Sequence, residues 1–406
     1  MKNVKKWNHF MLGAVLAAGI LSGCNGAGGK EESTAEETVS EDTALSADTV
    51  LIEEATDTIH ISIDKTKAKC DLTRSMTAAD RPVDISYEEV LDILAGKEPG
   101  EEVDLRAFAL NVSEISEILE LTAGQDITLL YNVIVGDIVL SHTDTEVSLS
   151  GLKLKEIDGF DLSVFLSLLP ELETVEMLDC GYDNDEMAEI CEQYEDIFFV
   201  WEVVLEHWTF RTDIVAFTSD KTCADTFYMH NEDAKYLKYC KKLMALDLGH
   251  NYVNDFSFLE KLTDLRVLIV VDNVLSTRAD GSLHHIEDLS VLNNLTEMRY
   301  LEIFSNAISD ISFLNNMPKL MDVNISYNPI YDASPLFGHP RLRRIWLEHT
   351  NIPGGQIEKL RASYPNAKIV SVGEGSIDQG WRANEDYYAM RRCFHENMID
   401  PIFLEE

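Results

Sequence analysis

The feature that most constrains this chain is an asparagine that recurs in its second half at a 22-residue spacing. Four segments share the pattern apolar-x-apolar-x-x-Asn-x-apolar, starting at Leu246, Leu268, Leu301 and Val323, and a fifth, starting at Ile345, has Thr in place of Asn. The shared polar column holds Asn251, Asn273, Asn306, Asn328 and, at the fifth place, Thr350. Successive members lie 22, 33, 22 and 22 residues apart, so the long step contains one repeat plus an 11-residue insertion.

A repeat of this length predicts a solenoid. One short strand and its return segment cannot bury an apolar side alone, but stacked copies form a continuous core. Because side chains alternate along a strand, Leu246 and Leu248 should point inward and Asp247 outward. The asparagine falls where the chain turns away from the strand. Its side-chain amide can there pair with backbone groups that the turn leaves unpaired.

Longer repeats precede this block. Strand-like starts occur at Val103, Val147 and Val175, and helix-like runs lie at 112–122, 161–169 and 185–194. The apolar pattern of residues 180–200 returns at 350–370, and that of residues 126–133 returns at 196–203. The predicted fold class is therefore α/β, a repeat solenoid with a curved parallel sheet. Helix-containing longer repeats occupy its N-terminal half and 22-residue repeats its C-terminal half.

The 22-residue pattern resembles the leucine-rich repeats of bacterial internalin-like surface proteins. The resemblance implies a repeat domain over 103–372, a sheet that lines a concave face, and ligand binding on that face. An open solenoid must cover its terminal core. We therefore expect an N-terminal cap at 58–102 and a C-terminal helical cap at 373–406, with the helix near 384–397.

The register places a set of large and polar side chains on the expected concave face. The candidate ligand-binding residues are Ile269, Tyr300, Phe304, Tyr327, Arg344, Trp346, Glu348 and His349. Exposed aromatic clusters usually mark interaction sites, with a polar rim around them. The alternative is that loops or the insertion at 276–286 cover these residues.

The N-terminus predicts the location of the protein. Three lysines precede an apolar stretch at 10–20 that is too short to cross a bilayer. The stretch ends in Leu21-Ser22-Gly23-Cys24, which resembles a bacterial lipobox. That resemblance implies removal of residues 1–23 and a diacylglycerol on Cys24, which would hold the protein at the extracytoplasmic face of the cell membrane. The alternative is an ordinary signal peptide with a chance cysteine.

The net charge of the chain argues against nucleic acid as a partner. Lys and Arg number 33 against 72 Asp and Glu, a net charge of −39, so no basic patch favours nucleic acid. Residues 1–23 carry three lysines and no acid, so their removal would leave a charge of −42. Behind the lipidated cysteine, residues 24–57 carry ten acidic residues and no apolar period. We expect this stretch to be a disordered tether.

The sequence indicates no enzyme and no cofactor. It contains no glycine-rich phosphate loop, no HExxH, no Gly-x-Ser-x-Gly and no paired CxxC. His284 and His285 in the insertion are the best metal candidates, but adjacent loop histidines are more often solvated, so no metal site is predicted.

The predicted function is therefore a membrane-anchored leucine-rich repeat protein that binds a protein partner, with a glycan or a peptide less favoured. Two alternatives stay open. One is an extracytoplasmic hydrolase or metal-dependent enzyme whose site lies in the insertion or in 203–240. The other is a structural component of the envelope.

Overall fold

The structure is a computed structural model that describes residues 86–108, 110–221, 227–273, 289–373 and 377–405. The chain divides into two units, Met1–Leu72 and Thr73–Glu406, and every described residue belongs to the second. The signal peptide, Cys24, the tether, most of the N-terminal cap and the insertion at 276–286 lie outside the described residues. Predictions about them remain predictions.

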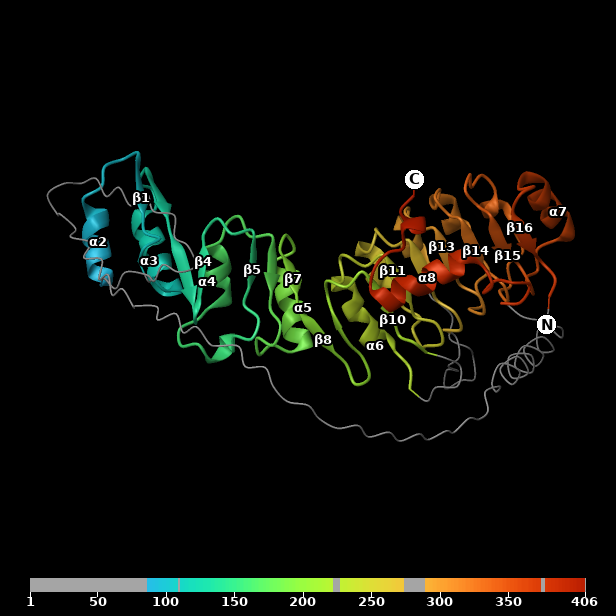
Figure 1. The fold of residues 1–406 in the computed structure, drawn as a ribbon, viewed down its shortest axis with the longest axis horizontal. Helices are drawn as coiled ribbons and strands as arrows, with labels where there is room; N and C mark the ends of the chain where they lie inside the picture. Colours follow the sequence, from blue (N-terminus) through green and yellow to red (C-terminus); the bar gives the residue numbers. More distant parts are fainter. Residues whose placement is uncertain (1–85, 109, 222–226, 274–288, 374–376, 406) are drawn as a thin grey trace, which may run out of the picture. The chain divides into compact units, whose positions relative to one another are not determined.

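A seven-stranded parallel sheet forms the centre of the 22-residue repeats (Figure 1). Its strands follow chain order: β10 (Ala216–Thr218), β11 (Ala245–Asp247), β12 (Val267–Ile269), β13 (Tyr300–Glu302), β14 (Asp322–Asn324), β15 (Arg344–Trp346) and β16 (Lys368–Val370). Leu268 lies directly opposite Leu301, across the long step, as the repeat predicts. Ile303 and Ile325, the expected second core column, are buried. The register of the five predicted strands is thus confirmed, whereas β10 is an additional strand.

Short 3-10 helices return the chain between these strands, because a 22-residue repeat leaves little room for a longer helix. They are η2 (Lys235–Tyr239, preceded by the single turn α6, Asn231–Ala234), η3 (Ser257–Lys261), η4 (Ser290–Asn294), η5 (Ser312–Asn316) and η6 (Ser334–Leu336). The last repeat uses a full helix, α7 (Gly354–Ser363), and then enters β16.

The asparagine column forms a ladder of hydrogen bonds inside the solenoid. Asn328 donates to the carbonyls of Ile303, Ile325 and Ser326. Its Oδ1 accepts from the backbone N–H groups of Asn306 and Ile308, each at 3.0 Å. The other asparagines of the column make equivalent bonds between neighbouring repeats. The predicted structural role of the column is confirmed.

The longer repeats in the first half form smaller sheets. Helix α2 (Tyr87–Ala95) precedes the parallel pair β1 (Glu101–Asp104) and β2 (Ile127–Leu130), which flank α3 (Val112–Thr122). A second sheet contains β5 (Glu146–Ser148), β6 (Thr174–Glu176) and β7 (Phe198–Val200), with η1 (Leu154–Glu156), α4 (Leu162–Ser167) and α5 (Asn184–Gln193) between its strands. The predicted helices are confirmed.

Two antiparallel hairpins interrupt the repeats, so the parallel sheet is not continuous over 103–372. They are β3 (Asn132–Val135) with β4 (Ile138–Ser141), and β8 (Glu202–Val204) with β9 (Thr209–Arg211). Each follows a parallel strand, β2 or β7, which explains the sequence likeness between residues 126–133 and 196–203. Period alone does not separate a hairpin strand from a repeat strand, because both alternate with period 2.

The C-terminal region is helical as predicted, but it does not cap the last repeat. Helix α8 (Glu385–Glu396) and the turn η7 (Pro401–Phe403) lie over the sheet, and α8 packs against β10 and β11 (Figure 1). The expectation of a cap at the end of the solenoid is therefore wrong. Among the described residues, no helix has the length and apolar character that crossing a bilayer requires.

Candidate functional site: the covered concave face

The predicted binding residues share one sheet face, but most of them are not exposed. The face in question is the side of β10–β16 that points away from the repeat core, called the concave face below. Six of the eight candidates are buried: Ile269, Tyr300, Phe304, Arg344, Trp346 and Glu348. Only Tyr327 is half-buried and His349 exposed. The expectation of an open aromatic patch is therefore wrong, because residues 377–405, the C-terminal segment, cover it.

Aromatic side chains attach the C-terminal segment to the middle of the sheet. Trp381 is fully buried, with its ring centroid 4.9 Å from that of Trp346 and 5.5 Å from that of Tyr300. Phe403 reaches the same tyrosine from the end of the segment, at 6.2 Å. Edge and tilted contacts of this kind stabilise aromatic pairs by about 0.5–1.5 kcal/mol beyond the area that they bury. The aromatic patch is thus a seat for rings of the same chain.

A buried carboxyl beneath the segment accepts hydrogen bonds from both sides of this contact. The indole N–H of Trp381 donates to Glu302 Oε1 at 2.7 Å, and the Tyr300 hydroxyl donates to the same oxygen. Burial raises the pKa of Glu302, while these hydrogen bonds oppose the rise. Because an unpaired buried carboxyl is costly, Glu302 favours an occupant that brings an N–H or O–H donor.

Two arginines hold the start of α8: Arg344, the first residue of β15, and Arg343, directly before it. Arg343 donates to Asp386 Oδ1 at 2.6 Å, and Arg344 donates to the Trp381 carbonyl at 2.6 Å. The Arg344 guanidinium also lies 4.2 Å from the Trp381 ring centroid and 3.6 Å from Asp322. Burial raises the pKa of Asp322 well above its usual range even though Arg344 opposes the rise. Arg344, Asp322 and Asp386 are buried, whereas the Arg343 side chain keeps contact with water.

The end of the segment is held through its backbone. Arg266 donates to the carbonyl of Phe403, and both Arg299 and Arg341 donate to the carbonyl of Glu405. Arg266 and Arg299 occupy the same place in successive repeats, directly before β12 and β13. A column of cationic donors thus runs along one edge of the sheet in a strongly acidic chain.

At the first strand, Asn397 joins the segment to the sheet edge. Its Oδ1 accepts from the backbone N–H groups of Val215 and Ala216 at 2.9 and 3.1 Å. Asn397 also ends α8 with a left-handed φ of 48°, a conformation that asparagine tolerates better than most residues. The helix therefore crosses the face from the arginines of β15 to the edge strand β10.

A second buried carboxyl lies where the chain turns from β16 into the segment. Glu348 is fully buried, and burial together with the neighbouring Asp378 raises its pKa to about 8. A Cβ at position 373 would meet the carboxyl end of Glu348, so any other residue there requires this side chain to move. The indole N–H of Trp346 donates to the Asp378 carbonyl at 3.2 Å. The segment and the sheet therefore share a proton-dependent contact at this corner.

The part of the concave face that stays accessible lies at its edge. Tyr327 and His349, in adjacent repeats, stack with ring centroids 4.2 Å apart. Both have a φ of 54°, as the turn after each strand requires, although this conformation costs a residue with a side chain about 1–2 kcal/mol. Further along the same column, His250 pairs with Asp272 at 3.3 Å. Of these side chains, Tyr327 lies near Asp378 of the C-terminal segment.

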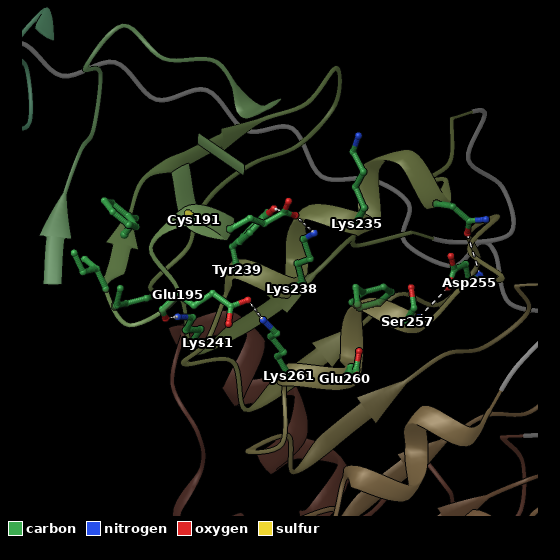
Figure 2. A pocket seen from close by; sticks show the side chains of 16 residues that line it. Cys191, Glu195, Lys235, Lys238, Tyr239, Lys241, Asp255, Ser257, Glu260 and Lys261 are labelled. Carbon is green, nitrogen blue, oxygen red and sulfur yellow. Dashed lines mark hydrogen bonds and ion pairs between the residues drawn. The ribbon is translucent and has the colours of Figure 1, made fainter. Parts of the chain in front are cut away.

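A cavity of about 510 Å³ lies elsewhere, where the helix α5 and strand β7 meet η2 and η3 (Figure 2). Lysines surround it, but their charges are balanced: Lys238 pairs with Glu192 at 2.7 Å and Lys261 with Glu195 at 3.0 Å. Burial raises the pKa of the Cys191 thiol to about 11, which makes it a poor nucleophile. The wider α-helix α5 is followed in the next repeats by the narrower 3-10 helices η2 and η3. The cavity therefore lies at the boundary between the longer repeats and the 22-residue repeats.

Over the residues that the structure describes, no cluster of three or more His, Cys, Asp or Glu side chains could hold a metal ion. His284 and His285 fall outside that part of the chain. Cys180, Cys191, Cys240 and Cys393 are free thiols.

Comparison with known proteins gives likenesses to solved structures alone. No protein-family model and no curated protein matches the chain. It is similar to internalin C2 of Listeria monocytogenes at 18% identity and a TM-score of 0.30, over 55% of this chain and 80% of that one. It is also similar to an internalin, inlF, of the same organism at 15% identity and a TM-score of 0.30, over 64% of this chain and 68% of that one. The functional domain of InlJ, also from Listeria monocytogenes, is similar at 14% identity and a TM-score of 0.26, over 61% of this chain and 49% of that one. TM-scores this low carry no argument, so the leucine-rich repeat fold rests on the strand register and the asparagine ladder.

Proposed function

We propose that this protein is anchored to the extracytoplasmic face of the cell membrane through lipid on Cys24 and binds a protein partner with its repeats. The lipobox-like Leu21-Ser22-Gly23-Cys24 and the acidic stretch behind it support the location. Two acyl chains anchor a protein firmly where a single chain binds only marginally. In this account the acidic stretch keeps the repeat domain clear of the bilayer.

One observation carries the binding proposal: the concave face already holds a polypeptide segment. It does so with aromatic seats at Tyr300 and Trp346, with an arginine pair for a carboxylate, and with arginines that reach backbone carbonyls. Buried aromatic rings and arginines are the side chains that most often dominate protein interfaces. A face that can hold a segment of its own chain has the chemistry to hold one from a partner.

The accessible edge offers the first contact. Tyr327 lies near Asp378 of the C-terminal segment, and both Tyr327 and its stacking partner His349 keep contact with solvent. A partner could engage this stacked pair before any covered residue becomes available. The experiment is therefore directed at these two side chains, since truncating them leaves the buried core of the repeats unchanged.

We would crosslink intact cells that carry the full-length protein, identify the captured protein by mass spectrometry, and measure its affinity after purification. The double variant Tyr327→Ala/His349→Ala should bind at least about tenfold more weakly than the wild type. Tyr331→Ala is the matched control, because this tyrosine lies in the same repeat and is 64% exposed but is outside the predicted site. Equal affinity for the wild type and the double variant would place the partner elsewhere.

Anchoring is tested separately. Cys24→Ser should stop lipidation and move the protein from the membrane fraction to the soluble fraction. Metabolic labelling with a fatty acid analogue gives a direct readout of the lipid. A variant that keeps both the label and the membrane location would contradict the lipobox interpretation without affecting the binding proposal.

A further inference from the structure

The C-terminal segment is packed as an addition to the repeats and not as part of their core. The seven-stranded sheet is complete without it, because the described part of the segment contributes no strand. The apolar side chains around it form a cluster of outward-facing sheet residues and residues of the segment. The inward column, with Leu246, Leu268 and Leu301, is not part of that cluster. Lifting the segment would therefore leave the core of the solenoid intact.

Three side chains of the segment make its principal contacts. Trp381 fills the space between Tyr300 and Trp346, and Phe403 closes the other side of Tyr300. Asp386 lies against the arginines of β15. Most of the outer surface of α8 remains open to water, including Tyr388, which is 52% exposed. The arrangement is that of a peptide lying in a groove, with a few buried anchors and a solvated back.

We propose that the C-terminal segment is an intramolecular ligand of the concave face, and that it exchanges with a partner segment carrying an aromatic ring and, about five residues later, a carboxylate. The spacing is that of Trp381 and Asp386. The inference rests on the proposed function, since it names the partner chemistry for the same face. It adds that the binding site is closed until its own segment leaves.

The groove itself determines this chemistry. Glu302 requires a hydrogen-bond donor, which an indole or a phenol can bring. Arg343 and Arg344 require a carboxylate, because removing Asp386 leaves their charges with only the buried Asp322. The arginines before β12 and β13 can donate to the free carbonyls of any backbone in that place. Because these arginines lie together at the groove, an acidic, aromatic peptide fits there even though the net charge of the whole protein is −39.

The first test measures opening in the intact protein without any ligand. Cys393 lies in α8 and is fully buried against the sheet, whereas Cys180 and Cys240 are buried within the repeats. A maleimide should label Cys393 at least about tenfold faster than Cys180 and Cys240 under native conditions, as peptide mapping would show. Local opening costs less free energy than global unfolding, which is why the rates should separate. Labelling of the three thiols at one common rate would overturn the proposal.

The second test exchanges the segment. A protease site is inserted between Gly375 and Ser376 of the full chain and is cut after folding, which removes the effective concentration of about millimolar that a short tether supplies. A fluorescent peptide of residues 377–406 should then replace the native fragment. Peptides with Trp381→Ala or Asp386→Asn should bind at least about tenfold more weakly than the wild-type peptide. The matched control, Tyr388→Ala, should bind like the wild type because this ring points to solvent.

The outcomes separate this inference from the proposed function. If the nicked fragment leaves only when the repeats unfold, the segment is part of the fold and the inference is wrong. A protein partner could in that case still bind the edge formed by Tyr327 and His349. If the peptide exchanges but the Trp381→Ala and Tyr388→Ala peptides bind equally, the face is exchangeable but the proposed partner chemistry is wrong.

Discussion

Replacing Asn328 with alanine should destabilise the repeats far more than the loss of one ordinary hydrogen bond. The side chain is 1% exposed and makes five bonds with its own and the preceding repeat. Two of the carbonyls keep another donor: Ile303 accepts from Asn306, and Ser326 from the backbone of Ser305. The third carbonyl, that of Ile325, loses this donor, but the larger cost falls on the backbone N–H groups of Asn306 and Ile308, which would lose the bond to Oδ1.

The magnitude follows from these two donors. An unsatisfied buried polar group costs about 1–3 kcal/mol, so two N–H groups should cost about 2–6 kcal/mol in the free energy of unfolding. Thr350 provides a matched control because it occupies the same column one repeat later. Its hydroxyl donates only to the Leu347 carbonyl, at 2.9 Å. Thr350→Ala should therefore cost about 0.5–1.5 kcal/mol, the net value of one bond.

Urea unfolding of both variants, followed by far-ultraviolet circular dichroism, measures the difference. The m value should stay close to that of the wild type if only stability changes. Equal losses for Asn328→Ala and Thr350→Ala would refute the argument. The ladder would then contribute through ordinary single bonds and not through satisfying buried backbone donors between repeats.

Three further predictions concern the core and the covered face. Ile325→Ala should lower the free energy of unfolding by about 2–5 kcal/mol, measured by urea unfolding, because this side chain is fully buried in the repeat core. Arg344→Ala should weaken peptide binding to the nicked protein, since it leaves the carboxyls of Asp322 and Asp386 with less compensation; Asp322→Asn in the same chain should recover part of the loss. The pKa of Glu348 is raised from 4.5 to about 8 when the C-terminal segment is docked. The docked state therefore holds a proton that the open state releases. Docking should be strongest below about pH 4.5 and should weaken as the pH rises through 8. The dissociation constant of the peptide should rise by at most tenfold per pH unit across that window. In Glu348→Gln, whose side chain has no proton to lose, the dissociation constant should depend less on pH. An equal slope in both proteins would contradict this cause.

The strand register could be predicted because it is a local, repeated property of the sequence. Leu268 and Leu301 were expected on neighbouring strands from the asparagine spacing, and they lie opposite each other. Strand β10 was missed because, in the register that pairs Phe217 with Leu246, Ser219 and Thr222 stand where the other repeats have an apolar residue and an asparagine. The pairing of Phe217 with Leu246 shows that the solenoid extends one strand further than the polar column indicates.

The covering of the concave face could not be predicted from the same pattern. Residues 384–397 have the apolar spacing of a helix with one buried side, and that spacing does not identify the surface that the helix covers. The contact between Trp381 and Glu302 joins positions 79 residues apart, beyond any period of the repeat. The large outward side chains Tyr300 and Trp346 indicated that something covers the face or binds to it. They did not distinguish a partner from the C-terminal segment of the same chain.

Hydrogen–deuterium exchange on the full chain, comparing the wild type with Trp381→Ala, tests whether the C-terminal segment can leave the sheet while the repeats stay folded. The fully buried Trp381 ring is one of the principal anchors of the C-terminal segment, whereas the strands depend on the inward column and the asparagine ladder. Amides of 385–396 should lose protection in the variant while those of β11 to β14 keep it. Equal protection of 385–396 in both proteins, or a simultaneous loss in the helix and the strands, would contradict a separable segment that closes the binding face.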